Sequence, residues 1–141
     1  MAGAGRQPFE AEHTVSPPSP ENEPAAVIDI RIAEETEHLV VLRVSGELDM
    51  LTAPILTEYV QEQFARDAAS GPRTVVFDLT RVSFLGSAGL AVLAHAQTAA
   101  AGRGDAVQIV ATGRAVLRPL EVTGLDKVLD VRPDMPAHDS D

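Results

Sequence analysis

The chain has 141 residues, a length that predicts one folded domain rather than two. It contains no cysteine, which excludes disulfides, thiolate zinc sites and a cysteine nucleophile. It has only four histidines, so no metal or cofactor site is expected. The formal net charge of −10 argues against direct binding of nucleic acid, because DNA- and RNA-binding domains usually present a basic face.

Both ends of the chain are predicted to lie outside the folded domain, which we place at residues 25–132. Residues 1–24 hold five of the ten prolines and few large apolar side chains, so they cannot bury enough surface to offset the entropy of ordering. We expect a disordered N-terminal tail there and a flexible C-terminal tail over residues 133–141. No apolar stretch follows Arg6, so a secretory signal peptide is not predicted and a cytoplasmic location is expected.

The folded part is predicted to open with two strands and a helix. Alternating apolar residues predict strands over 27–32 and 38–45, and the short charged link between them favours a hairpin. Helical spacing of apolar residues then predicts a helix over 53–68. Thr52 is expected to be its N-cap, and Pro54 fits its first turn.

The second half is predicted to alternate strands and helices. The near-continuous apolar run over 74–79 is typical of a strand that is buried on both faces. We then expect a loop over 81–86, a helix over 87–101, a strand over 106–111, a helix over 114–122 and a final strand over 127–131. Strands joined by helical crossovers pair in parallel, so we predict a single α/β domain with a mixed four- to five-stranded sheet and helices mainly on one face.

The predicted helix over 87–101 carries no charged residue. With the glycines on either side of it, the uncharged stretch is 17 residues long and rich in alanine. A membrane-spanning helix needs about 20 strongly apolar residues. We therefore expect a buried amphipathic helix and no membrane insertion.

The start of this helix carries the strongest functional indication. Ser87 is a common N-cap type, and its neighbours Gly86, Ala88 and Gly89 are small enough to let a partner approach. The first turn of a helix presents unpaired N–H groups and a partial positive charge, so a phosphate on the Ser87 hydroxyl would be tolerated. The residues alone leave two interpretations open, a helix cap only or a modification site.

A third interpretation, Ser87 as a catalytic nucleophile, lacks a base. His95 lies eight residues further along the same helix, about 12 Å along its axis, and His38 has no evident carboxylate partner. A Gly-x-Ser-x-Gly elbow is only half present, because position 85 is Leu. The chain is therefore predicted not to be an enzyme.

Three other polar features are weaker. Asp49 follows the second strand, where an aspartate either binds loop amides or contacts a partner. Asp78 lies inside an apolar strand and needs a paired group, for which Arg81 is the candidate. The Arg-Gly-Asp tripeptide at 103–105 falls between a helix and a strand, which predicts a plain turn.

At these residues the chain resembles the STAS domain family, in particular the bacterial anti-sigma factor antagonists. The resemblance covers about residues 25–132. It is carried by Gly-Glu-Leu-Asp at 46–49, by Phe-Leu-Gly-Ser-Ala-Gly-Leu at 84–90 after an apolar strand, and by Val-Thr-Gly-Leu-Asp at 122–126. The resemblance implies that Ser87 is phosphorylated, and it implies a partner-binding surface made by Asp49, Gly86, Ser87, Ala88 and Gly89.

The resemblance further implies a partner switch. The unphosphorylated chain would bind an anti-sigma factor that is also a serine kinase of the histidine-kinase-like ATPase type, and a sigma factor would be released. The kinase, which supplies ATP and magnesium, would phosphorylate Ser87 and then release the chain. A serine phosphatase would remove the phosphate and reset the cycle. The family often has Asp before this serine and a second Ser after it, where this chain has Gly86 and Ala88. These departures keep an alternative open, namely a phosphorylation-independent binding or scaffold subunit of a transporter or stress complex.

Overall fold

The computed structural model describes residues 28–66 and 71–136. The predicted tail over 1–24, the last part of the C-terminal tail and the predicted element ends at 27 and 68 lie outside the described residues. The elements are β2 (Ile28–Glu35), β3 (Leu39–Leu48), α1 (Ala53–Phe64), β4 (Thr74–Leu85), α2 (Ser87–Arg103), β5 (Ala106–Val110), α3 (Arg114–Thr123), the 3₁₀ turn η3 (Leu125–Lys127) and β6 (Asp130–Arg132).

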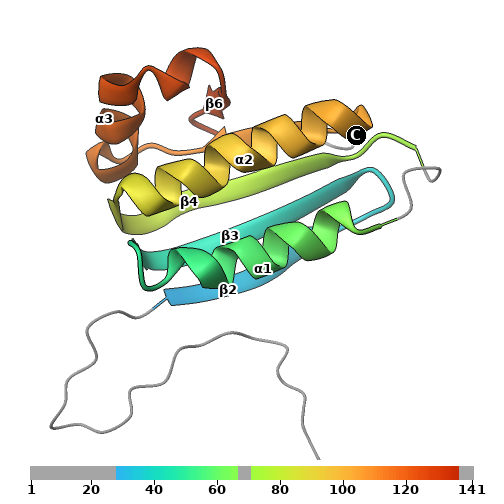
Figure 1. Ribbon diagram of the computed structural model, residues 1–141, viewed down its shortest axis with the longest axis horizontal. Helices are drawn as coiled ribbons and strands as arrows, with labels where there is room; N and C mark the ends of the chain where they lie inside the picture. Colours follow the sequence, from blue (N-terminus) through green and yellow to red (C-terminus); the bar gives the residue numbers. More distant parts are fainter. Residues whose placement is uncertain (1–27, 67–70, 137–141) are drawn as a thin grey trace, which may run out of the picture.

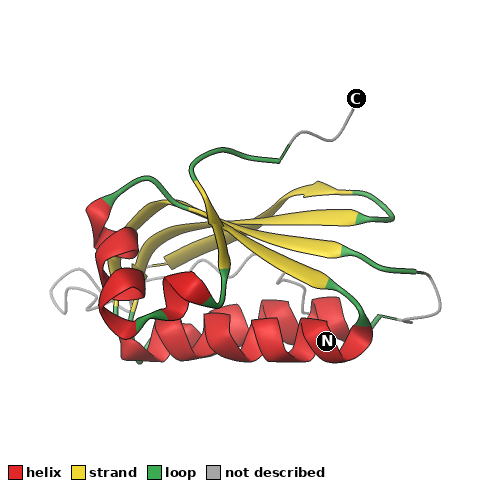
Figure 2. Cartoon of the chain, turned by 90° about the horizontal axis from the view of Figure 1, so that it is seen from above, coloured by secondary structure: helices red, strands yellow, loops and turns green. Residues whose placement is uncertain are grey.

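The five strands form one mixed sheet in the order β2-β3-β4-β5-β6. The pair β2–β3 is antiparallel, as the predicted hairpin requires, and the other three pairs are parallel. Each crossover from β3 onward steps to the next strand in the same direction, and right-handed crossovers therefore place their helices on one face. Figure 2 shows the long helices beneath the sheet, and Figure 1 shows α1 and α2 side by side. The predicted fold class is confirmed.

The core lies between this sheet and the helices. Side chains alternate along β4, so that Val75 and Phe77 face the helices while Val76 joins a second buried cluster on the other face with Val41. All four are at most 1% exposed. The first half of β4, over 75–79, is therefore buried on both faces, as its continuous apolar run predicts.

The structure corrects several predicted boundaries. The segment over 81–86, expected to be a loop, continues β4 to Leu85, and β3 runs on to Leu48 rather than ending at position 45. The two extensions pair with each other, Gly46 with Val82 and Leu48 with Leu85, across register shifts that break the period-two pattern. Helix α1 ends at Phe64, and the last strand shrinks to β6, preceded by η3.

The predicted partner of Asp78 is also corrected. The Asp78 carboxylate accepts a hydrogen bond from Arg43 Nε at 3.2 Å, not from Arg81, because Arg43 lies opposite it in the register of β3 and β4. It also accepts bonds from the Thr80 hydroxyl at 2.7 Å and the Thr80 amide at 3.1 Å. Burial raises the pKa of Asp78, but the bonds from Thr80 and Arg43 outweigh it and hold that pKa below 3.8.

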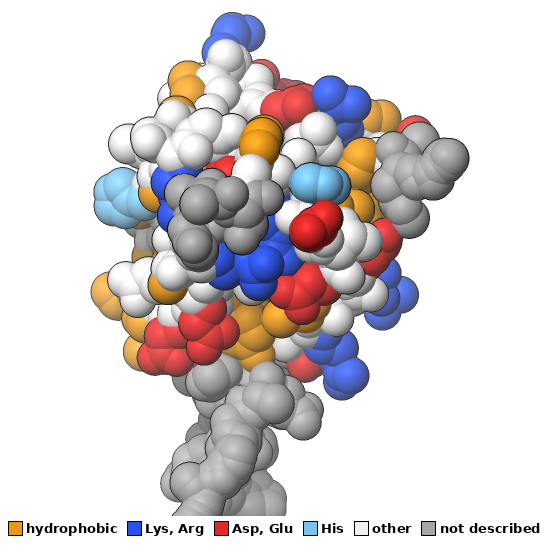
Figure 3. Space-filling model, turned by 90° about the vertical axis from the view of Figure 1, so that its right-hand side faces the viewer, with side chains coloured by type: hydrophobic (Ala, Val, Ile, Leu, Met, Phe, Trp, Pro, Cys, Tyr) orange, Lys and Arg blue, Asp and Glu red, His pale blue; other side chains and the backbone are white. Residues whose placement is uncertain are grey.

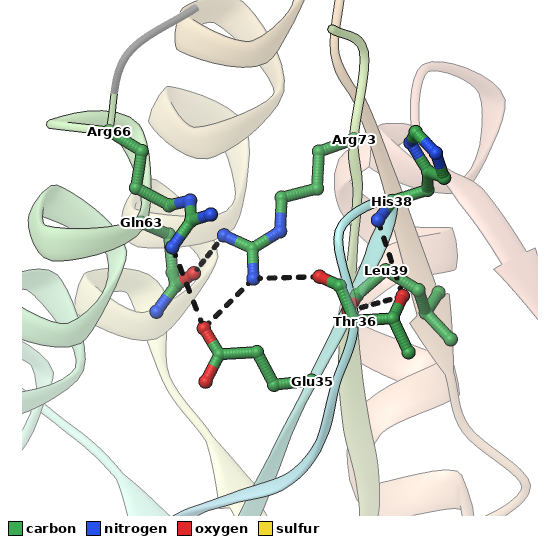
Figure 4. Close-up of polar contacts among 7 residues, drawn as sticks. All are labelled: Glu35, Thr36, His38, Leu39, Gln63, Arg66 and Arg73. Atoms are coloured by element: carbon green, nitrogen blue, oxygen red, sulfur yellow. Dashed lines mark hydrogen bonds and ion pairs between the residues drawn. The ribbon is translucent and has the colours of Figure 1, made fainter. Parts of the chain in front are cut away.

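The end of the molecule away from the start of α2 is held by a polar network. Figure 3 faces this end and shows basic side chains near its middle. The Arg73 side chain is only 6% exposed, and it donates to Gln63 Oε1 at 2.8 Å and to Glu35 Oε2 at 2.9 Å, with Arg66 near the same carboxylate at 3.7 Å (Figure 4). This network joins α1 to the C-terminal end of β2 and to the start of β4, so its role is structural.

Candidate functional site

Ser87 is the first helical residue of α2 and is exposed. The sequence offers Ser87 as a helix cap, but in the structure it is not the N-cap. Gly86 holds that position in an extended conformation, and no side chain caps the helix. The Gly86 amide donates to the Leu48 carbonyl at 2.8 Å, and the Gly86 carbonyl accepts from the Leu90 amide at 3.0 Å. The glycine backbone therefore joins α2 to the sheet, and the Ser87 hydroxyl takes no part in this junction.

The two glycines beside Ser87 let α2 approach the strand ends closely. A Cβ on Gly89 would lie 2.9 Å from Leu48 Cβ and 2.7 Å from Leu85 Cδ1, both of them buried residues. A Cβ on Gly86 would lie 3.0 Å from the Phe84 ring. Gly89, expected on the partner-binding surface, is itself buried and supports that surface from below. Gly86 and Ala88 are half-buried beside the hydroxyl.

Asp49 organises the loop between β3 and α1. Its Oδ1 accepts hydrogen bonds from the Leu51 amide at 2.9 Å and the Thr52 amide at 3.1 Å, which is the loop-amide arrangement foreseen for it. Thr52 occupies the N-cap position of α1 as predicted, but its side chain makes no capping bond, because its hydroxyl donates to the Glu47 carbonyl at 2.6 Å. The same hydroxyl accepts from the Asp49 amide at 3.0 Å. The loop that borders the α2 start is thus held by its own side chains.

Sequence reasoning missed a set of exposed apolar side chains on the segments that flank Ser87. Met50 is 74% exposed, Leu51 63% and Phe84 50%. Met50 lines the same hollow as Ala88, and the Phe84 ring lies against Gly86. We call Met50, Leu51 and Phe84 the apolar rim. Grouped exposure of this kind marks contact surfaces on soluble proteins, and no sequence pattern distinguishes it from core residues.

Neither histidine in the described part of the chain is placed to activate the Ser87 hydroxyl. His95 is exposed further along α2, and His38, which contacts Glu37 at 3.6 Å, belongs to the opposite end of the sheet. No group of three or more metal-ligating side chains occurs among the described residues.

The Arg-Gly-Asp tripeptide forms a structural turn. Gly104 has a φ of 81° and caps the C-terminus of α2, while Arg103 Nε pairs with the Asp105 carboxylate at 2.9 Å. The Arg103 guanidinium also donates to the Phe64 carbonyl at 2.9 Å and the Arg66 carbonyl at 3.1 Å, which ties α2 to the end of α1. None of the helices in the described part of the chain, α2 included, has the length and apolar character to cross a membrane.

Comparison with known proteins adds four findings. The STAS domain model matches residues 31–137. The chain is 40% identical over 87 residues to the anti-sigma-F factor antagonist RsfB of Mycobacterium tuberculosis, covering 62% of this chain and 67% of that protein. It is 28% identical over 106 residues to the anti-sigma-B factor antagonist of Listeria monocytogenes, covering 74% and 89%. The crystal structure of an anti-sigma factor antagonist from Mycobacterium paratuberculosis superposes with a TM-score of 0.66 at 35% identity, covering 77% of this chain and 87% of that one.

Proposed function

Because this chain belongs to the STAS domain family, we propose that it is an anti-sigma factor antagonist controlled by phosphorylation of Ser87. The unphosphorylated chain binds an anti-sigma factor, so that a sigma factor is released. The phosphorylated chain dissociates from the anti-sigma factor. One observation carries the proposal: Ser87 is exposed at the start of α2, and Gly86 rather than the serine occupies the N-cap.

In this proposal the chain is substrate and ligand, and its partner supplies the catalysis. The anti-sigma factor is a serine kinase of the ATPase type. The Ser87 oxygen attacks the γ-phosphorus of the kinase's ATP, the hydroxyl proton passes to a base of the kinase, and ADP leaves. A serine phosphatase later hydrolyses the ester with water, which returns the hydroxyl and frees inorganic phosphate. The lack of an activating histidine near Ser87 in the described residues supports this division of roles.

The surroundings of Ser87 explain why a phosphate would change binding but not folding. The new group carries a charge of about −1.5 to −2, which the positive end of α2 accommodates. The partner, in contrast, meets that charge next to the apolar rim of Met50, Leu51 and Phe84, where a phosphate must give up water. A penalty of about 3 kcal/mol lowers affinity more than a hundredfold, since each 1.4 kcal/mol is a factor of ten.

Labelling by the host's anti-sigma factor kinases with radioactive ATP tests the site. Wild-type chain and Ser83→Ala should take up phosphate, and Ser87→Ala should not. Ser83 is the matched control, because it is also exposed and lies just before the helix. Undiminished labelling of Ser87→Ala refutes the assignment, and Ser87→Asp should bind the same kinase at least tenfold more weakly than wild type.

A second function, binding without a phosphoryl switch, is favoured by one departure from the family pattern. Position 86 is a glycine with the Phe84 ring against it, where the family often has an aspartate. In this alternative the same surface serves a scaffold subunit of a transporter or a stress complex. Unchanged partner affinity of Ser87→Asp would favour the alternative.

A further inference from the structure

A groove runs between α1 and α2 on the outer side of the molecule. Two adjoining hollows of about 330 Å³ and about 410 Å³ share Thr57, Val92 and His95 as walls. One extends to Phe64, and the other extends to Met50, next to the start of α2. The groove therefore follows both helices and opens beside Ser87.

The α2 wall of this groove is exposed yet carries no Asp, Glu, Lys or Arg. Ala91, His95 and Ala99 are exposed and line it at a spacing of four residues, which puts them on one face of α2. Ser87 belongs to the same row. An outward helix face normally carries charged side chains, whereas the centre of a protein–protein interface is depleted of them. Folding alone does not require this exposed face to be neutral.

The α1 side supplies the charge that selects a partner. Glu58 and Glu62 are exposed on α1 and directly follow the wall residues Thr57 and Gln61 in sequence, but neither lines the groove. A segment lying in the groove therefore meets a neutral, largely apolar floor and an acidic outer edge. A groove between two neighbouring helices fits a third helix, and from Ala88 to Ala99 it spans about 16 Å of α2.

We propose that this groove receives an amphipathic helix of the anti-sigma factor, with its apolar face on α2 and with lysine or arginine along the edge that faces α1. The inference rests on the proposed function and extends its surface, because the groove is continuous with the apolar rim at Met50. A helix seated there anchors the kinase beside Ser87 while its active site reaches the hydroxyl. It also gives the partner a contact that does not depend on the phosphate.

Titration of the host's purified anti-sigma factors against variants of the full chain tests the groove. Ala99→Arg puts a charge in the groove far from Ser87, and Gln61→Arg does so from the α1 wall. Ala101→Arg is the matched control, because it is exposed on the same helix but does not line the groove. We expect at least a tenfold loss of affinity for both groove variants and less than a twofold change for the control, with unchanged melting temperatures. If one groove variant unfolds, the other decides.

The outcomes separate the two proposals. Groove variants that bind like wild type, while Ser87→Asp binds weakly, overturn the groove and leave the phosphorylation switch standing. Weak binding by the groove variants with unchanged binding by Ser87→Asp supports the groove and rejects the switch. If wild-type chain binds none of the anti-sigma factors, both proposals fail.

Discussion

Two glycines of α2 provide a matched test of how the helix is set against the sheet. Replacing glycine by alanine inside a helix stabilises it by about 1 kcal/mol when the new methyl group has room. At Gly102 nothing lies within 4 Å of the new Cβ, so Gly102→Ala should raise the free energy of unfolding by about that amount. At Gly89 the same substitution meets Leu48 Cβ at 2.9 Å and Leu85 Cδ1 at 2.7 Å.

Whether Gly89→Ala raises or lowers the free energy of unfolding depends on which atoms the new methyl group meets. The Leu85 methyl ends a side chain and can turn, but Leu48 Cβ is fixed to the backbone of a residue that is 0% exposed. Either α2 or the end of β3 has to move, and overpacking of this kind costs about 1–3 kcal/mol. After the propensity gain is subtracted, Gly89→Ala should lower the free energy of unfolding by about 1 kcal/mol, which separates the two variants by about 2 kcal/mol.

Urea titration followed by circular dichroism measures this difference. The midpoint should rise for Gly102→Ala and fall for Gly89→Ala, with equal slopes, because both variants bury nearly the same surface. Because the methyl group at position 89 displaces the start of α2, Gly89→Ala should also alter phosphorylation of Ser87, and Gly102→Ala should not. A Gly89→Ala protein at least as stable as Gly102→Ala would refute the close packing described for α2.

The remaining predictions concern two buried charged residues, Asp78 and Arg73. The folded pKa of Asp78 lies below its ordinary value of 3.8, so its contribution to stability is complete above that value and is lost as the pH falls through the folded pKa. Asp78→Asn should therefore lower the free energy of unfolding by about 1–3 kcal/mol at pH 7, and the deficit measured by denaturant titration should shrink below pH 3.8. Arg73→Ala leaves the buried Gln63 oxygen without this donor and should cost about 2–3 kcal/mol in the same titration. Arg66→Ala, which removes an exposed pair at 3.7 Å, should cost under about 1 kcal/mol, and equal losses for the two arginines would contradict the role given to burial.

The fold could be predicted because its signals are local and periodic. Alternation, helical spacing and the crossover rule are enough to give a mixed sheet with its helices on one face. The strand extensions could not be predicted in the same way. Residues 46–48 and 82–85 become strand only because they pair with each other, and the register shifts between them hide the alternation that would mark each segment alone.

The site shows the same division between local and non-local information. The place of Ser87 at a helix start follows from the sequence, but the choice of Gly86 as cap depends on its bond to Leu48, which belongs to another strand. In the same way, Arg43 and Asp78 are 35 residues apart and meet through the sheet register, whereas local reasoning points to the nearby Arg81.

The use of Gly86 as cap bears directly on how a switch could work at this position. If the Ser87 hydroxyl held the helix end, its esterification would remove a hydrogen bond and couple phosphorylation to the stability of α2. The bonds at this junction run instead from the Gly86 amide to Leu48 and from the Leu90 amide to Gly86, so a phosphate leaves both intact. A ligand shifts an equilibrium only by its differential affinity for the two states. The energy of such a switch must then be found almost entirely at the contact with the partner, where the apolar rim and the neutral face of α2 meet the new charge.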